Sequence, residues 1–409
     1  VLVVSAMLGG SISSAMGEGY VQTNLVSNNP DFHPQILDPL VINAWGIALR
    51  PAGAGGHFWI NNTDSGTVTE YVGDVGGTPL FQDDLKVVTV APPPGSPPGT
   101  KSTPTGQVFS GHASDFTVSG EGLTGPSRFL FVTEDGTLSG WTERKVNGGF
   151  ERQTISVITV DNSAQGAIYK GLAVTNAPSD NRLFAANFGQ DRIDVWDKQF
   201  QAIIPPGLFS VPDGTIPKDY APFNIQNLNG TLYVAYAKLS GTPGEELQGP
   251  GLGYLASFDL NGNFLHVWEG KGLLNAPWGL AIAPSDFGEF SDALLIGNFG
   301  DGTIVGYDQM TRMPLDHLRD PAGNPITIDG LWGSHSVMAP AWEKRTICIS
   351  RQGLTTKPTA CLGSFNDPSD SAGHHQPACL FRHFRSPPFL RIAQHATHSA
   401  CARPRLAGD

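Results

Sequence analysis

A short apolar segment that carries a glycine recurs along the chain, and no other feature limits the possible folds so strongly. The clearest copies are Asn275-Ala276-Pro277-Trp278-Gly279-Leu280-Ala281 and Asn43-Ala44-Trp45-Gly46-Ile47-Ala48. Two further copies lie at 169–173 and 329–333, a third at 221–225 has Phe in place of Trp and Asn in place of Gly, and a degenerate one lies at 114–118. Self-similarity of this kind indicates a repeat architecture, in which one structural unit is stacked or arranged in a ring.

A second element follows each copy. It reads as an apolar strand, a turn of Asn, Asp or Gly, and a second apolar strand, and it is clearest at Leu294–Asp308. Related stretches lie at Leu183–Asp197, Phe129–Trp141 and Phe58–Tyr71. Because Gly, Asn and Asp tolerate the positive φ of tight β-turns, this pattern is typical of a β-hairpin.

The copies start near residues 43, 114, 169, 221, 276 and 329, mostly about fifty residues apart. The longer first interval contains a Pro- and Gly-rich insertion at 91–99, and the high content of Gly (50) and Pro (32) suits many tight turns. We therefore predict an all-β, six-bladed β-propeller over residues 17–333. A seven-bladed ring is the alternative, if the region 75–110 hides a further unit.

The segments 275–281, 298–304, 221–226 and 324–333 together resemble a bacterial family of exported proteins with NHL-like β-propeller repeats, sometimes associated with a C-terminal PEP-type sorting signal. The resemblance covers about residues 20–333. It implies the propeller fold and export from the cytoplasm, and it implies no activity that can be transferred to named residues.

The first residues indicate a compartment. Residues 1–12 are apolar or small and lead into Ser13-Ser14-Ala15, a small-x-small pattern that suits signal peptidase. Residues 1–16 are therefore predicted to be the remnant of a secretory signal, with a buried first strand as the alternative, and the protein is expected to be secreted or periplasmic. No other stretch approaches the ~20 apolar residues of a membrane span. The net charge of −12 and the absence of a basic stripe argue against a nucleic-acid partner.

The composition changes after Gly333. The last 76 residues, 334–409, contain nine Lys or Arg, four Asp or Glu, six of the 11 His and all four Cys. Reading the back-translated segment from the last base of the Gly333 codon permits Leu-Gly-Lys at 342–344 and Asn-Asp-Leu-Tyr-Phe at 346–350, which restores a strand–turn–strand pattern. We therefore predict a frame shift, an incomplete last blade and a non-native, disordered tail over 334–409. A divergent tail that is expressed as given is the alternative.

Propellers bind ligands at the mouth of the central channel, where we expect the innermost strands to begin. In the aligned copies this shared position is occupied by Trp45, Lys170, Phe223, Trp278 and Trp332, with Asp115 nearby in the degenerate copy. Such a ring could stack on a carbohydrate or aryl ligand. The alternative is that the aromatic side chains pack between blades.

Oxygen-bearing side chains in the turns form a second set of candidates. Those chosen as possible Ca²⁺ ligands are Asp64, Glu134, Asn187, Asn298 and Asp329. The alternative is that each stabilises its own turn. Before residue 334 the histidines are His33, His57, His112, His266 and His317, which are widely spaced and do not form an evident zinc motif.

Two functions remain open at this stage. The first is a secreted scaffold that binds a carbohydrate, a peptide or a surface protein at its channel mouth. The second is a calcium-assisted hydrolase, such as a lactonase, or a lyase, with its active site in the channel.

Overall fold

The computed structural model describes residues 19–20, 22–51, 56–73, 79–177, 179–203, 207–285, 287–339, 342–351 and 360–366. Within these residues the chain is built from strands and four short 3-10 helices, and it has no α-helix. The 3-10 helices are η1 (Pro30–Phe32), η3 (Ser163–Gln165), η4 (Phe188–Gln190) and η5 (Gly288–Phe290).

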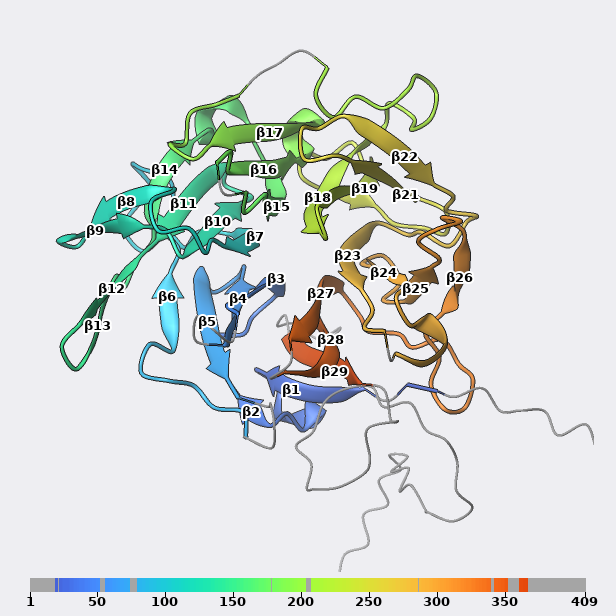
Figure 1. The fold of residues 1–409 in the computed structure, drawn as a ribbon, viewed down its shortest axis with the longest axis horizontal. Helices are drawn as coiled ribbons and strands as arrows, with labels where there is room; N and C mark the ends of the chain where they lie inside the picture. The colour runs from blue at the N-terminus through green and yellow to red at the C-terminus, as the bar shows by residue number, and fades with distance from the viewer. Residues whose placement is uncertain are drawn as a thin grey trace, which may run out of the picture.

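Five sheets are arranged like blades around a central axis, as Figure 1 shows. The first contains β3 (Ala44–Leu49), β4 (His57–Asn62), β5 (Thr67–Val72) and β6 (Val87–Thr89). The second contains β7 (Pro104–Phe109), β10 (Phe129–Thr133), β11 (Thr137–Trp141) and β14 (Val157–Asp161). The third contains β15 (Tyr169–Val174), β16 (Arg182–Asn187) and β17 (Arg192–Asp197).

The fourth sheet contains β18 (Tyr220–Leu228), β19 (Thr231–Leu239), β20 (Glu246–Leu247), β21 (Gly253–Phe258) and β22 (Phe264–Trp268). The fifth contains β23 (Pro277–Ile282), β24 (Leu294–Asn298), β25 (Ile304–Tyr307) and β26 (Pro314–His317). Two hairpins project from the second sheet, β8 (Thr117–Gly120) with β9 (Leu123–Pro126) and β12 (Glu143–Val146) with β13 (Gly149–Arg152). The all-β propeller prediction is confirmed, and so are the four predicted hairpins, which are β4–β5, β10–β11, β16–β17 and β24–β25.

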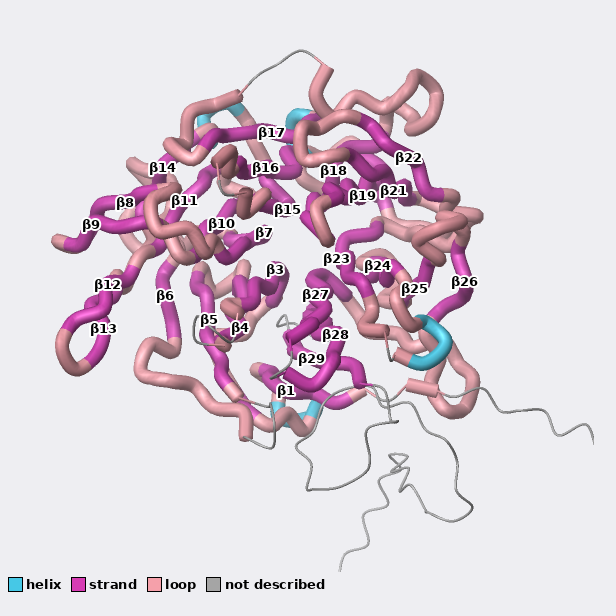
Figure 2. The backbone as a smooth tube through the Cα atoms, viewed as in Figure 1, coloured by secondary structure: helices cyan, strands magenta, loops and turns pink. Residues whose placement is uncertain are grey.

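A further sheet joins the two ends of the described chain. Its strands are β1 (Thr23–Ser27), β2 (Ile36–Leu37), β27 (Leu331–Ala339), β28 (Trp342–Arg351) and β29 (Ala360–Asn366), in the order β2-β1-β29-β28-β27. β1 pairs antiparallel with β29, so that Thr23 lies opposite Ser364 and Ser27 opposite Cys361. In Figures 1 and 2 this sheet occupies the part of the ring between the first and fifth sheets.

This sheet corrects one expectation from the sequence. We expected no strands after residue 333, whereas β28 and β29 lie there and pair with each other and with β1. The physical reason is that an exposed strand edge offers the same backbone N–H and C=O groups to any sequence, so pairing needs no particular side chains. Residues 367–409 and the predicted signal remnant at 1–16 lie outside the described residues.

The hydrophobic core lies between neighbouring sheets. Between the first and second sheets, the rings of Trp59 and Phe129 stack with their centroids 3.8 Å apart. On β1, Leu25 and Val26 pack against Phe58 and Tyr71 of the first sheet. Each sheet face is therefore buried by its neighbour, which is why most strands read as continuous apolar runs.

Every innermost strand changes its register at the repeated position. The shift falls between Ala44 and Ile47 on β3, and the corresponding shifts on β15, β18 and β23 lie at Tyr169/Gly171, Pro222/Asn224 and Pro277/Gly279. The ladders of β7 and β27 also shift at their first residues. A β-bulge turns a side chain away from its normal alternation. The repeat seen in the sequence is thus a repeated bulge at the start of each inner strand.

The second inner strand was assigned wrongly from the sequence. The sequence predicts a degenerate copy at Ser114–Val118, but the innermost strand of the second sheet is β7, and residues 117–118 belong to the projecting hairpin β8–β9. The true equivalent of Trp278-Gly279 is Thr105-Gly106. Thr105 has no aromatic ring, so at β7 only Gly106 matches the Trp-Gly pair of the clearest copies. The region 79–110 holds β6 and β7 of neighbouring sheets rather than an additional sheet.

Candidate functional site

Four of the six predicted channel residues form one aromatic layer. Trp45 stacks on Trp332 with ring centroids 3.6 Å apart, and Trp278 meets both rings edge-on, at 6.5 Å and 6.2 Å. Phe223 contacts Trp332 at 5.8 Å. All four side chains are buried. These rings from different inner strands therefore pack against one another near the start of those strands, and a role of the layer in ligand binding stays a prediction.

Lys170, the fifth predicted residue, is buried among aromatic faces. Its Nζ lies 4.9 Å from the ring centroid of Trp45 and 5.8 Å from those of Phe188 and Phe223. The same ammonium donates to Oε1 of Glu134 at 2.5 Å. Because a buried cation is costly unless it is paired, the carboxylate and the aromatic faces together compensate the lost hydration of Lys170.

Asp115, the sixth predicted residue, has no contact with the aromatic layer that the structure describes. It is buried beside β8, where its Oδ2 accepts a hydrogen bond from Asn181 and lies 3.5 Å from Nδ1 of His112. Its place in the repeat is taken by Thr105, whose hydroxyl donates to the carbonyl of Tyr169 at 2.7 Å. The sequence does indicate that Thr105 belongs to the repeat, because Pro104-Thr105-Gly106 matches Pro277-Trp278-Gly279 at the Pro and Gly positions.

Beyond the aromatic layer the channel opens into a cavity of about 370 Å³. The cavity is lined by the C-terminal halves of β3, β7, β15 and β18. Of the predicted ring residues, Trp278 is also among the lining residues. Its polar lining consists of hydroxyl and carboxamide side chains: Gln107, Thr175, Asn176, Asn224, Gln226, Asn227 and Asn229. None of the described lining residues carries an ionisable side chain.

Several of these carboxamides are held in place by the neighbouring strands. Nε2 of Gln107 donates to the carbonyls of Gly46 and Trp59, both at 2.7 Å, while its Oε1 is buried without a hydrogen-bond partner among the described residues. Nδ2 of Asn224 donates to the carbonyl of Trp278 at 2.6 Å. The wall of the cavity is therefore preorganised rather than collapsed on itself.

The glycine of the repeat lets the inner strands of neighbouring sheets approach each other closely. A Cβ on Gly46 would lie 2.2 Å from the carbonyl oxygen of Thr105. A Cβ on Gly106 would lie 2.4 Å from the backbone nitrogen of Leu172, and one on Gly171 would lie 2.0 Å from Oδ1 of Asn224. Contacts this short exclude a side chain at Gly46, Gly106 and Gly171, where a glycine follows residues as different as Trp, Thr and Lys, whereas β18 has Asn224 at the same position.

The predicted calcium ligands take part in local hydrogen bonds. Asp64 accepts from Asn43 at 3.0 Å, Asn187 accepts from the backbone nitrogen of Ile168 at 3.2 Å, and Asn298 accepts from that of Asn275 at 3.0 Å. Glu134 binds Lys170, as described above, and Asp329 lies exposed in the turn before β27. The calcium site in the channel stays a prediction.

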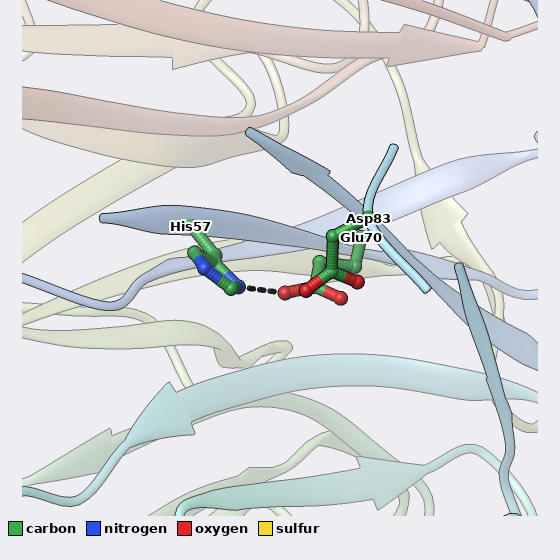
Figure 3. A group of neighbouring side chains, drawn as sticks. All are labelled: His57, Glu70 and Asp83. Atoms are coloured by element: carbon green, nitrogen blue, oxygen red, sulfur yellow. Dashed lines mark hydrogen bonds and ion pairs between the residues drawn. The ribbon is translucent and has the colours of Figure 1, made fainter. Parts of the chain in front are cut away.

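A different group of potential metal ligands is brought together outside the channel. His57, Glu70 and Asp83 each place one ligand atom within 4.8 Å of the others (Figure 3). His57 and Glu70 lie on β4 and β5, while Asp83 lies in the loop before β6. The sequence does not predict this group, because Asp83 lies in an irregular loop whose position does not follow from a strand pattern.

The fold defines this protein as an all-β propeller. No helix in the described part of the chain is long and apolar enough to cross a membrane.

No family model matches the chain. Among curated proteins, Uncharacterized protein R648 of Acanthamoeba polyphaga mimivirus is 31% identical over 313 residues, which cover 76% of this chain and 72% of that protein. Uncharacterized protein L690 of the same virus is 30% identical over 318 residues, covering 76% of this chain and 78% of that protein. The chain belongs to the family of these two viral proteins.

Solved structures with a similar fold are more distant. A gluconolactonase from Xanthomonas campestris is 14% identical, with 58% of this chain and 82% of that chain covered and a TM-score of 0.36. A protein of unknown function from Bacteroides thetaiotaomicron is 11% identical, with 84% and 76% covered and a TM-score of 0.46. Neither likeness bears on the activity of this chain. The relatives named here are viral, and the bacterial origin and sorting signal that the family resemblance implied stay predictions.

Proposed function

We propose that this protein binds a neutral, hydroxyl-rich ligand, a short carbohydrate, in the cavity at the open end of its channel. The observation that carries the proposal is the lining of that cavity, where seven hydroxyl and carboxamide side chains surround a space of about 370 Å³. Carboxamides both donate and accept hydrogen bonds, as sugar hydroxyls do. A cavity of this size accommodates a small molecule rather than a folded partner.

The floor of the cavity supports the same ligand class. Trp278 lines it, and the apolar face of an indole ring packs well against the C–H face of a sugar. The described lining residues are uncharged, so a neutral ligand would leave no ion unpaired, whereas an anionic or cationic ligand would lose hydration without a partner.

Isothermal titration with a panel of neutral, anionic and cationic saccharides tests the proposal. Gln226→Ala removes a half-buried carboxamide from the wall, and about tenfold weaker binding of the best neutral saccharide is expected. Gln199→Ala, at an exposed position on the outside of the third sheet, is the matched control and should leave binding unchanged. Binding that prefers charged saccharides, or that survives Gln226→Ala, contradicts the proposal.

The same panel should include lactones and simple esters, with and without Ca²⁺. Calcium-dependent turnover of any of them would replace the binding proposal with the calcium-assisted hydrolase that the sequence left open. Turnover that is lost in Asn298→Ala but not in Gln226→Ala would then assign the reaction to the turn residues.

We propose further that the sheet β2-β1-β29-β28-β27 acts as a sixth blade. It provides an inner strand, β27, whose Trp332 completes the aromatic layer, and β1 covers the first sheet. The predicted frame shift after Gly333 remains part of this proposal, because a frame-restored chain would supply a last blade with the repeat's own pattern.

Three chains distinguish the possibilities: the chain as given, the chain truncated after Gly333, and the frame-restored chain. Cooperative melting is expected to improve in the frame-restored chain, since better-packed blade faces bury more apolar surface. If all three chains melt alike in a sharp transition, the frame-shift proposal is wrong.

Export is a separate proposal, supported by the apolar residues 1–12 and the small residues that follow them. A fusion of residues 1–30 to a reporter that is active only outside the cytoplasm tests it. A reporter that stays inactive would favour the buried-strand alternative.

A further inference from the structure

Three ligand-bearing side chains converge on one side of the first sheet, outside the channel. His57 lies opposite Val72 in the β4–β5 ladder, and Glu70 lies opposite Trp59, so His57 and Glu70 are diagonal neighbours on one face of the hairpin. Nδ1 of His57 contacts Oε1 of Glu70. Asp83 approaches both from the loop that leads into β6, as Figure 3 shows.

Glu70 is the most deeply buried of the three. Its residue is 1% exposed, and its second carboxylate oxygen, Oε2, has no hydrogen-bond partner among the described residues. A buried carboxylate oxygen without a donor or a cation is costly. The arrangement therefore leaves a specific oxygen unsatisfied at the point where the three side chains meet.

Two arginines border the group, but a different carboxylate holds them. Nη1 of Arg50 lies 2.6 Å from Oε1 of Glu143, and Nε of Arg152 lies 3.1 Å from Oε2 of Glu143. Arg152 also reaches the group, with Nη2 at 3.5 Å from Oδ2 of Asp83. Glu70 has no described arginine partner, so its charge is left to be compensated by something else.

We propose that His57, Glu70 and Asp83 form a binding site for a divalent transition metal of the zinc type. One imidazole nitrogen and two carboxylate oxygens make a three-ligand set that leaves a fourth position for water. Ligand atoms around zinc lie about 3.4 Å apart for bonds of about 2.1 Å, so modest side-chain rotations bring the group within 4.8 Å to bonding geometry. The metal would take the place of the proton between His57 and Glu70.

The ligand types favour zinc over hard cations such as Ca²⁺. Ca²⁺ prefers six to eight oxygen ligands and gains little from an imidazole nitrogen. The neighbouring arginines also weaken purely electrostatic binding, whereas a zinc–nitrogen bond is less sensitive to them.

A metal at this position would fasten the loop that carries Asp83 to the hairpin β4–β5. Since Arg152 of β13 contacts Asp83, the same loop connects the first sheet to the projecting hairpin β12–β13 of the second. The site would therefore link two neighbouring sheets, and none of its three ligand residues is among those that line the channel cavity.

Zinc content and zinc affinity of the full-length protein test the proposal. All four cysteines, Cys348, Cys361, Cys379 and Cys401, are first replaced by serine, so that thiols cannot supply the metal ligands. After dialysis against Zn²⁺ alone, this background should retain one zinc per chain, and zinc should raise its melting temperature. His57→Ala and Glu70→Gln should bind zinc at least tenfold more weakly and lose the zinc-dependent rise.

His266→Ala is the matched control, because His266 is exposed on β22 and should leave zinc binding unchanged. Asp83→Asn provides a second variant at a more exposed position, in case the substitution of buried Glu70 prevents folding. Equal zinc retention by the background and by both His57→Ala and Asp83→Asn would overturn the proposal, as would a background that binds no zinc or is not stabilised by it.

Discussion

The indole rings of Trp45 and Trp332 stack face to face, 3.6 Å apart, although one begins the first inner strand, β3, and the other lies in the last, β27. Nε1 of Trp332 also donates to Oδ1 of Asn43, at 3.3 Å. These contacts join the beginning and the end of the repeat region inside the channel.

Trp332→Ala should therefore destabilise the whole ring rather than a single sheet. Removing a large buried aromatic side chain typically costs about 3–5 kcal/mol. The expected loss in the free energy of unfolding is measured by urea denaturation. Met310→Ala, at an 87% exposed position, is the control and should change stability little. A loss below about 1 kcal/mol for Trp332→Ala would show that the channel layer does not contribute to closure.

Lys170 and Glu134 should be energetically coupled. Glu134→Ala removes the carboxylate that accepts from the buried ammonium of Lys170, whereas Lys170→Met removes the ammonium itself. A double-mutant cycle on the free energy of unfolding should give a coupling of more than about 1 kcal/mol. The exposed pair Lys238–Asp219 serves as the comparison, and its coupling should stay below about 1 kcal/mol. Equal coupling in the two pairs would contradict the importance of burial.

Gly106→Ala should prevent close approach of β7 and β15. The added Cβ would meet the backbone of Leu172 at 2.4 Å, where no side-chain rotation relieves the clash. A loss of about 3 kcal/mol or more is expected, at the upper end of overpacking effects. Gly149→Ala is the matched control, because a Cβ there has nothing within 4 Å. Similar melting temperatures of the two variants would mean that the inner strands separate easily.

The stability of the metal-free protein should fall on acidification through His57. Its pKa is lowered chiefly by burial and also by Arg50 and Arg152, while Asp83 and Glu143 act in the opposite direction. The unfolded chain therefore takes up this proton first as the pH falls. The stabilising contribution is fully present above the unfolded pKa of about 6.5 and is lost as the pH falls through the lower folded pKa.

Replacing this histidine should reduce that pH dependence. His57→Gln should lose less stability than the parent protein between pH 7 and pH 5, as measured by denaturation at each pH in the presence of a chelator. Glu70, which contacts His57 directly, remains unchanged in this comparison. His266→Gln, on the exposed face of β22, should follow the parent protein. An identical pH profile for His57→Gln and the parent would show that His57 is not the group responsible.

The sequence predicted the parts of the fold that depend on local chemistry. Turn residues and apolar periodicity located four hairpins, and the recurring Trp-Gly pairs located the aromatic layer. It failed at β7, where Thr105 replaces the aromatic residue and only the glycine persists. It also missed His57 with Glu70 and Asp83, because their proximity depends on hairpin register and on an irregular loop. The cavity was missed for a related reason, since its lining depends on which halves of four strands face one another.

The pairing of β1 with β29 has a consequence for the order of events in the cell. A ribosome adds roughly 5–20 residues per second, so β1 leaves it tens of seconds before its partner strand exists. During that interval Leu25 and Val26 have no closing strand beside them, and the growing ring has two open edges. Completion of the ring thus awaits β29, the last of the described strands to be synthesised, and β1 is open to pairing with other chains until then.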